Sequence, residues 1–197
     1  MQELLIATKN PGKFCEISEI FEGLPFELLF LGDMDVDDLD FVEDGVTFFE
    51  NARKKARYFS EKVGMLALAE DSGILVDALE GELGVRTRRW GAGETASDKE
   101  WIEYFMKKME REVNRGAKFV CSACLIDGGK EKYFEGETSG LITEKLMAPL
   151  QPGLPLSSCF LPEGCEKVYA ALSEDEKNLV SHRGKAIRAV RSFFETD

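Results

Sequence analysis

The sequence predicts an α/β fold in which helices flank a mixed β-sheet, with no clean domain boundary. Strand and helix signals alternate through the first half of the chain, a pattern typical of parallel strands joined by helices. In the second half, the hairpin signal Asp127-Gly128-Gly129 separates two strand-like runs and indicates an antiparallel pair. The 197 residues, of which 44% are hydrophobic, suffice for one sizeable core.

The first half begins with strand-like runs at residues 2–8 and 26–31, separated by a helix from Pro11 to Phe21. A second helix is expected after Thr47, because apolar residues recur there on one helical stripe. The members of this stripe are Phe48, Ala52, Ala56 and Phe59. The apolar run 65–69 then predicts a buried strand.

The second half continues with a short strand at 74–76, a glycine-rich turn at 81–84 and a helix near 98–111. Two strands at 117–127 and 131–138 form the predicted hairpin. The last expected element is a helix from about Gly184 to Phe194.

The most informative segment is Glu70-Asp71-Ser72-Gly73, which follows the apolar run 65–69. We expect the glycine turn to end the strand, so that the two carboxylates lie where ligand sites open in α/β sheets. This is a place for metal or base chemistry. The alternative is a pair of solvated acids in a turn.

Charge and cysteine content exclude several classes of protein. The net charge of -12 disfavours binding to nucleic acid, whereas a small phosphorylated ligand would need a local basic pocket and a divalent cation. The five cysteines argue against a disulfide framework. Cys121 and Cys124 lie three apart in a β-rich run and point to opposite faces, so buried apolar side chains are favoured over zinc.

The chain starts with a strand-like segment, and nowhere are there 18 uninterrupted apolar residues. We therefore expect a cytoplasmic protein with no membrane partner. The acidic run Asp33–Asp38 imitates the start of a calcium-binding loop, but Asp38 stands where the turn needs glycine. We interpret it as a solvated acidic loop.

Three further segments carry residues suited to binding an anion. In residues 7–13 a strand runs into a helix start, where Thr8, Asn10 and Lys13 can donate to phosphate oxygens; an ordinary N-capped helix is the alternative. Helix capping does not explain Glu43 and Lys55, which flank the start of the second helix. The segment Ser181-His182-Arg183 contains the single histidine of the chain. With Arg183, His182 can bind a planar or anionic ligand, and a purely structural histidine is the alternative.

In this order the segments resemble the inosine/xanthosine triphosphate pyrophosphatases, which clear non-canonical purine nucleoside triphosphates. The resemblance spans nearly the whole chain. The residues that carry it are Ala7–Lys13, Thr47–Ala52 with Lys55-Ala56, Glu70–Gly73, Phe134-Glu135-Gly136 with Gly140, and Ser181-His182-Arg183.

The resemblance implies one domain over residues 1–197, built of two lobes with a long, mixed, bent sheet and a central cleft, and usually a homodimer. It also implies Mg²⁺-dependent hydrolysis of triphosphates such as ITP, dITP or XTP to the monophosphate and pyrophosphate. The chemistry fits, because this reaction needs cations on phosphate oxygens and a carboxylate that holds Mg²⁺ and orients water.

The resemblance also implies roles for individual residues. Asp71 would be the general base and a metal ligand, with Glu43 and Glu70 as metal or water partners and Lys55 as a catalytic cation. The expected phosphate-binding residues are Thr8, Lys9, Asn10, Lys13 and Lys55, with Ser72 nearby. The expected base-contacting residues are Lys177, His182 and Arg183, together with Leu154, Leu156 and Ser157.

The segment 153–158 departs from the family, in which a Gly-Phe-Gly-Tyr/Trp-Asp-Pro sequence usually lines the base pocket. Here Leu154 and Leu156 replace aromatic rings, and Ser157 replaces the carboxylate. We therefore expect an altered or relaxed base preference. Two alternatives are a non-catalytic relative that binds nucleotides or phosphometabolites, and a phosphatase acting on another phosphorylated molecule.

Overall fold

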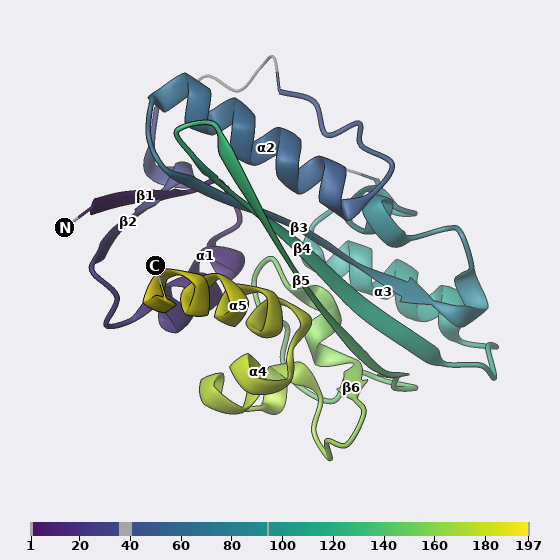
Figure 1. The fold of residues 1–197 in the computed structure, drawn as a ribbon. Helices are drawn as coiled ribbons and strands as arrows, with labels where there is room; N and C mark the ends of the chain where they lie inside the picture. Colours follow the sequence, from purple (N-terminus) through teal and green to yellow (C-terminus); the bar gives the residue numbers. More distant parts are fainter. Residues whose placement is uncertain (1, 36–40, 94, 197) are drawn as a thin grey trace.

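The computed structural model describes residues 2–35, 41–93 and 95–196, which are built around a six-stranded sheet (Figure 1). The order in the sheet is β2-β1-β3-β4-β5-β6. β1 pairs in parallel with β2 and β3, whereas the remaining pairs are antiparallel. The predicted mixed sheet is therefore confirmed. The strands are β1 (Gln2–Ile6), β2 (Phe26–Phe30), β3 (Ala67–Val76), β4 (Gly116–Asp127), β5 (Lys130–Ile142) and β6 (Phe160–Pro162).

Helices cover both faces of the sheet (Figure 1). The longer helices are α1 (Pro11–Phe21), α2 (Phe48–Val63), α3 (Asp98–Met109), α4 (Glu174–Val180) and α5 (His182–Thr196). The 3-10 turns are η1 (Leu31–Asp33), η2 (Asp77–Leu79), η3 (Gly84–Arg89), η4 (Pro155–Ser158) and η5 (Tyr169–Ala171).

Alternation along the strands divides the core between the two faces. On β1, Leu5 packs in a cluster with Ala52, Ala56 and Phe59 of α2, and Leu4 packs in another with apolar residues of α1 and α5. A third cluster joins α3 to the far ends of β3 and β4. α1, α2, α3 and α5 are therefore each held by the burial of one apolar face.

β3 differs from the sequence prediction, because it does not end at Glu70. It continues without a break through Asp71, Ser72 and Gly73 to Val76. Over this whole length it pairs residue by residue with β4, as in Glu70 with Ala123 and Asp71 with Ser122. Backbone pairing with a distant strand overrides the weak strand preference of these residues.

The C-terminal helices also differ in detail from the prediction. α5 begins at His182, two residues before the expected start at Gly184. The short helix α4 precedes it and was not predicted, because Lys177 is its only buried residue and it has no apolar stripe. Ser181 ends α4, and its hydroxyl accepts a hydrogen bond from the Gly184 N–H at 2.9 Å.

The two neighbouring cysteines of β4 lie on opposite faces, as predicted. Cys121 approaches Glu70, whereas Cys124 packs in the cluster under α2, and both are buried. The β4–β5 hairpin turns at Gly128 and Gly129, whose φ angles are 52° and 85°. Residues 36–40 of the expected acidic loop lie outside the described residues.

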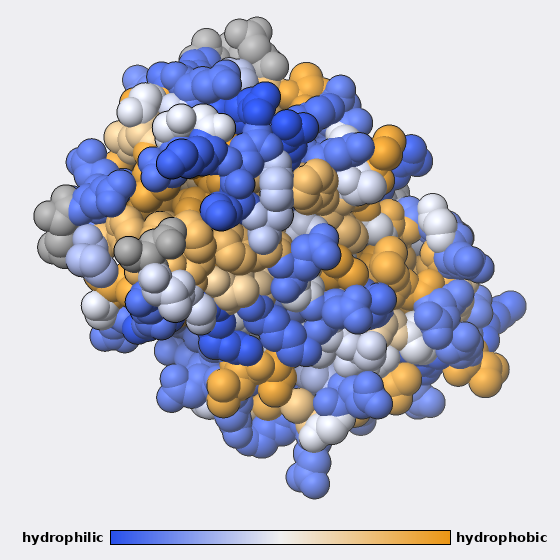
Figure 2. Space-filling model, in the orientation of Figure 1, coloured by the Kyte–Doolittle hydropathy of each residue, from blue (hydrophilic) through white to orange (hydrophobic). Residues whose placement is uncertain are grey.

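Hydrophilic side chains dominate the face of the molecule in Figure 2, with apolar patches between them. This matches a chain in which 31% of the residues are charged. No helix in the described part of the chain is long and apolar enough to span a bilayer.

Candidate active site

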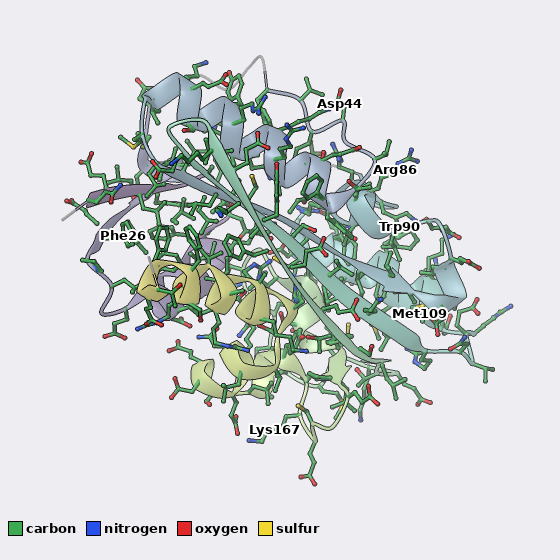
Figure 3. All side chains as sticks on the ribbon, in the orientation of Figure 1. Phe26, Asp44, Arg86, Trp90, Met109 and Lys167 are labelled. Carbon is green, nitrogen blue, oxygen red and sulfur yellow. The ribbon has the colours of Figure 1, made fainter. Side chains whose placement is uncertain are left out.

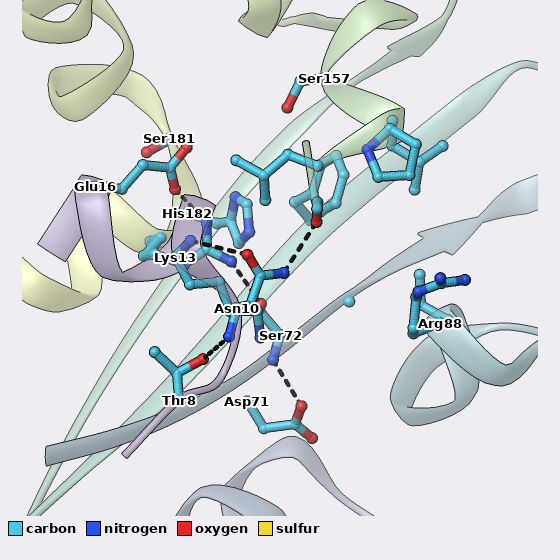
Figure 4. Close-up of a pocket in the computed structure, with 18 of the residues that line it drawn as sticks. Thr8, Asn10, Lys13, Glu16, Asp71, Ser72, Arg88, Ser157, Ser181 and His182 are labelled. Atoms are coloured by element: carbon cyan, nitrogen blue, oxygen red, sulfur yellow. Dashed lines mark hydrogen bonds and ion pairs between the residues drawn. The ribbon is translucent and has the colours of Figure 1, made fainter. Parts of the chain in front are cut away.

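A cavity of about 350 Å³ opens at one edge of β3 (Figure 4). β1 pairs with β3 only as far as Leu68, so β1 does not cover this edge of β3 beyond Leu68. Asp71 reaches the cavity from the face covered by α2, and Ser72 reaches it from the face covered by α5. Side chains from both faces therefore meet in one cavity.

The loop between β1 and α1 forms one wall of the cavity. Asn10 caps α1, because its side-chain oxygen accepts from the N–H groups of Gly12 at 2.9 Å and Lys13 at 3.2 Å. Its amide nitrogen donates to the carbonyl of Gly153 at 3.1 Å, and the Thr8 hydroxyl accepts from the Asn10 N–H. The N-capped helix is confirmed, and phosphate binding by Thr8, Lys9 and Asn10 stays a prediction.

Glu70 is a fully buried carboxylate that is not among the residues lining the cavity within the described chain. It pairs with Lys13 Nζ at 2.6 Å and lies 3.8 Å from Arg183 Nε. Burial would raise the pKa of Glu70, but Lys13 and Arg183 hold it well below its usual range. Glu70 therefore fixes two cations, and its expected role at a metal stays a prediction.

Asp71 lines the cavity and accepts two hydrogen bonds. Asn51 Nδ2 donates to Oδ2 at 2.9 Å, and the Ser72 N–H donates to Oδ1 at 3.0 Å. Burial raises the pKa of the Asp71 carboxyl, and the nearby Lys13 and Lys55 offset only part of that rise. The oriented carboxylate is therefore more basic than an exposed aspartate.

Glu43 and Lys55 form an ion pair on the α2 side of the cavity. Burial opposes the charge of Lys55, but attraction by Glu43 raises its pKa above the usual value. Arg89 of η3 donates from Nη1 to the Glu43 carbonyl at 3.0 Å. Glu43, which helix capping does not explain, is thus held beside the cavity by Lys55 of α2 and Arg89 of η3.

Glu16 of α1 is a further buried carboxylate, and it joins two cations expected at the base, Lys177 and Arg183. Its oxygens pair with Lys177 and Arg183, and burial opposes its charge, yet these cations lower its pKa. Lys177 Nζ also donates to the Gln151 side chain at 3.1 Å. Arg183 Nη2 donates to the Ser72 hydroxyl at 2.9 Å. This network of ion pairs and hydrogen bonds joins α1, α4, α5 and β3.

His182 is buried in an aromatic stack that also lines the cavity. Its ring lies parallel to Phe119 of β4, with centroids 4.6 Å apart, and 6.1 Å from the Tyr169 ring. Burial, reinforced by Arg183, lowers the pKa of His182 well below its usual value, so the imidazole is neutral at pH 7. His182 therefore has a packing role and also lines the cavity, and its contact with a base stays a prediction.

The backbone of α5 approaches β5 closely at Gly136. A Cβ atom at this position would collide with the His182 carbonyl and approach the Ala186 nitrogen at 2.7 Å. Glycine therefore lets the start of α5, with His182 and Arg183, reach the cavity.

The divergent segment 153–158 also reaches the cavity, through Leu154, Leu156 and Ser157. Leu156 is 5% exposed and belongs to the cluster that contains Trp101 and Phe160. The η4 segment thus contributes aliphatic surface and one hydroxyl to the cavity.

Sequence reasoning missed several residues of the site. Glu16 and Asn51 could have been predicted from the sequence, because each is a polar residue on a helix face that is otherwise buried. For five other residues that line the cavity, no sequence pattern distinguishes a position in the cavity wall from one in the core or on the surface. These are Arg88, Arg89, Trp101, Phe119 and Tyr169.

The charges of the cavity suit an anionic ligand. In the described chain, seven cationic side chains and three carboxylates line it, although the whole chain has a net charge of -12. This provides the local basic pocket that a phosphorylated ligand needs. The cations are Lys9, Lys13, Lys55, Arg88, Arg89, Lys177 and Arg183, and the carboxylates are Glu16, Glu43 and Asp71.

The donor set also fits Mg²⁺. No group of three or more His, Cys, Asp or Glu side chains in the described residues is arranged to hold a metal ion. Mg²⁺ with a nucleotide usually takes one or two protein carboxylates plus phosphate oxygens. Asp71 and Glu43 line the cavity and supply oxygen ligands of this kind.

The fold and cavity define an α/β protein with a basic cleft suited to a phosphorylated small molecule. Residues 4–193 match the model of the Ham1 family, and the chain belongs to this family. It is 39% identical over 194 residues to the dITP/XTP pyrophosphatase of Geobacter sulfurreducens, covering 97% of this chain and 96% of the relative. It is 35% identical to that of Oceanobacillus iheyensis, with full coverage of both.

Solved structures agree with this assignment. A HAM1 protein from Coxiella burnetii superposes with a TM-score of 0.85 at 29% identity, over 100% of both chains. The Ham1 protein of Staphylococcus aureus gives a TM-score of 0.81 at 31% identity, over 99% of both chains. The resemblance identified from the sequence motifs is confirmed.

Proposed function

We propose that this protein hydrolyses nucleoside triphosphates, including non-canonical purine triphosphates such as ITP, dITP and XTP, to the monophosphate and pyrophosphate. The observation that carries the proposal is an oriented, partly desolvated carboxylate, Asp71, beside two lysines in a basic cavity. The relatives named dITP/XTP pyrophosphatase support the same reaction.

The two lysines of the cavity suit the phosphate end of the substrate. Lys13 and Lys55 are held by Glu70 and Glu43, so their positions are set before a ligand arrives. The charges of both lysines lower the pKa of the Asp71 carboxyl, which supports a role for them beside this group. They would stabilise the negative charge that develops on the phosphoryl oxygens.

Asp71 is the group we assign to activate water. Asn51 and the Ser72 N–H orient its carboxylate, and burial makes it a better proton acceptor. Asp71 and Glu43 would hold Mg²⁺, which when bound supplies charge neutralisation on the phosphates. Glu70 serves the site through Lys13 and Arg183.

A second group of cavity residues suits the base and is unusual. Lys177, His182 and Arg183 offer polar groups, whereas η4 offers Leu154 and Leu156 in place of rings. We therefore propose a base preference that differs from that of relatives with an aromatic segment.

A pyrophosphate-release assay tests the proposal directly. The protein is incubated with Mg²⁺ and, in turn, ITP, dITP, XTP and the four common triphosphates. Release of pyrophosphate with formation of the monophosphate is expected for at least one of the oxopurine substrates. Binding without turnover would favour the non-catalytic alternative, and release of orthophosphate alone would favour a different phosphatase.

Further properties follow from the family resemblance and belong to the same proposal. A homodimer would give twice the 22.1 kDa mass of the chain in light scattering. A scattering mass of one chain at micromolar concentration would contradict it. A cytoplasmic location and the division of the domain into two lobes stay predictions.

A further inference from the structure

Trp101 of α3 carries a polar group that the fold leaves unused. The side chain is 2% exposed and lines the cavity. Its Nε1–H has no hydrogen-bond acceptor within the described residues. A buried indole N–H normally finds a partner, because leaving it unpaired is costly.

The other tryptophan of the chain provides a direct contrast. Trp90, labelled in Figure 3, packs edge-on against Trp101 with centroids 6.3 Å apart. Its Nε1–H donates to a Glu82 carboxylate oxygen at 3.1 Å, and it is not among the described residues that line the cavity. The unpaired N–H is therefore a property of the cavity-lining tryptophan.

The position of the Trp101 ring is fixed by packing. It stacks on Phe105 one turn further along α3, with centroids 5.5 Å apart and planes at 11°. α3 packs on η4, and Trp101 shares a core cluster with Leu156. The aromatic surface that is absent from η4 is thus present on the neighbouring helix.

We infer that Trp101 is a specificity-determining residue whose indole N–H donates to an oxo oxygen of the bound base. The inference rests on the function proposed above and deepens it. Hypoxanthine and xanthine present an oxo acceptor where adenine presents an amino group, which cannot accept this hydrogen bond. The site then rejects adenine because the buried N–H stays unpaired.

Substrate selectivity of Trp101→Phe tests the inference, because phenylalanine keeps a ring and removes the donor. We expect kcat/KM for ITP and XTP to fall about 5- to 10-fold, mainly through KM, with kcat/KM for ATP unchanged. Trp90→Phe is the matched control and should leave the ITP/ATP ratio as in the wild type. An unchanged ratio in a folded Trp101→Phe variant overturns the inference.

A second measurement uses the wild-type chain and does not depend on how the variant folds. The two tryptophans give two indole N–H resonances in a ¹H–¹⁵N spectrum, assigned by the loss of one in Trp90→Phe. Saturating IMP should shift the Trp101 resonance, and AMP should not. A resonance that stays in place with bound IMP overturns the inference.

The two proposals fail in different ways. If the wild type releases pyrophosphate while the ratio and the Trp101 resonance are unaffected, only the inference about Trp101 is wrong. If the wild type hydrolyses none of the triphosphates, the proposed function is wrong, and the inference that rests on it falls as well.

Discussion

Glu70 and Asp71 are adjacent carboxylates with opposite electrostatic surroundings. Strand alternation sends them to opposite faces of the sheet, where Glu70 meets Lys13 and Arg183 and Asp71 meets Asn51. Pairing lowers the pKa of Glu70, whereas burial raises that of Asp71. The difference separates a carboxylate that organises cations from one that can take a proton.

Asp71→Asn should lower kcat by at least about 100-fold, because it removes the proton acceptor at nearly constant shape. The asparagine side chain keeps one acceptor oxygen for Asn51 or Ser72, so the melting temperature should change little. Pyrophosphate release and thermal denaturation measure the two effects. Asp44→Asn, at an exposed ion pair with Lys54, is the control and should retain activity. Wild-type kcat in Asp71→Asn would remove Asp71 from its assigned role.

Glu16→Gln should destabilise the protein by about 3 kcal/mol at pH 7, because it leaves Lys177 without its carboxylate and Arg183 with Glu70 alone. The folded-state pKa of Glu16 is lowered, so its contribution is complete above the unfolded value of 4.5 and declines as the pH falls through the folded value. The stability gap between wild type and variant should therefore close below about pH 4.5.

Urea unfolding from pH 7 to pH 3 measures this gap. Glu61→Gln, on the exposed side of α2, is the control and should show no comparable gap. A gap as large at pH 3 as at pH 7 would mean that ionised Glu16 is not its source.

At the level of elements, close approach of backbones positions the site as much as side chains do. η3 lies against β3 at Gly73, where a Cβ atom would meet the Thr87 hydroxyl at 2.6 Å. α5 lies against β5 at Gly136, and it brings His182 and Arg183 to the cavity. Both glycines are needed for space, since neither has a positive φ angle.

Gly136→Ala should therefore displace the start of α5, cost about 1–3 kcal/mol of stability and raise KM. Gly140→Ala is the matched control, because Gly140 lies on the same strand as Gly136 and its Cβ atom would collide with the Leu161 carbonyl of β6 and not with the backbone of α5. Both variants should lose stability in urea, but only Gly136→Ala should lose substrate affinity. Equal KM values in the two variants would show that the glycine serves folding alone.

For the molecule as a whole, the predictable features are those with local signals. β1, β2, α1, α2 and the β4–β5 hairpin follow from periodicity and turn residues near each element. The continuation of β3 could not be predicted, because it depends on pairing with β4 about fifty positions away. α4 was missed because a short polar helix carries no periodic pattern.

The candidate site divides in the same way. Residues of recognisable motifs, such as Lys13, Asp71 and His182, could be predicted to lie together, and the cavity contains them. Glu16 and Trp101 gain their significance only from tertiary packing, which brings α1 to α4 and α3 to η4. A local pattern cannot encode such contacts.

The cavity joins elements from both faces of the sheet, so a ligand that fills it should stabilise the whole fold. We expect IMP, which the proposed reaction does not consume, to raise the melting temperature in a concentration-dependent way. At 100 times its dissociation constant the gain should be about 2.7 kcal/mol. Inosine, which lacks the phosphate for Lys13 and Lys55, should stabilise less at equal concentration. An equal effect of inosine and IMP in differential scanning calorimetry would mean that the basic end of the cavity does not bind phosphate.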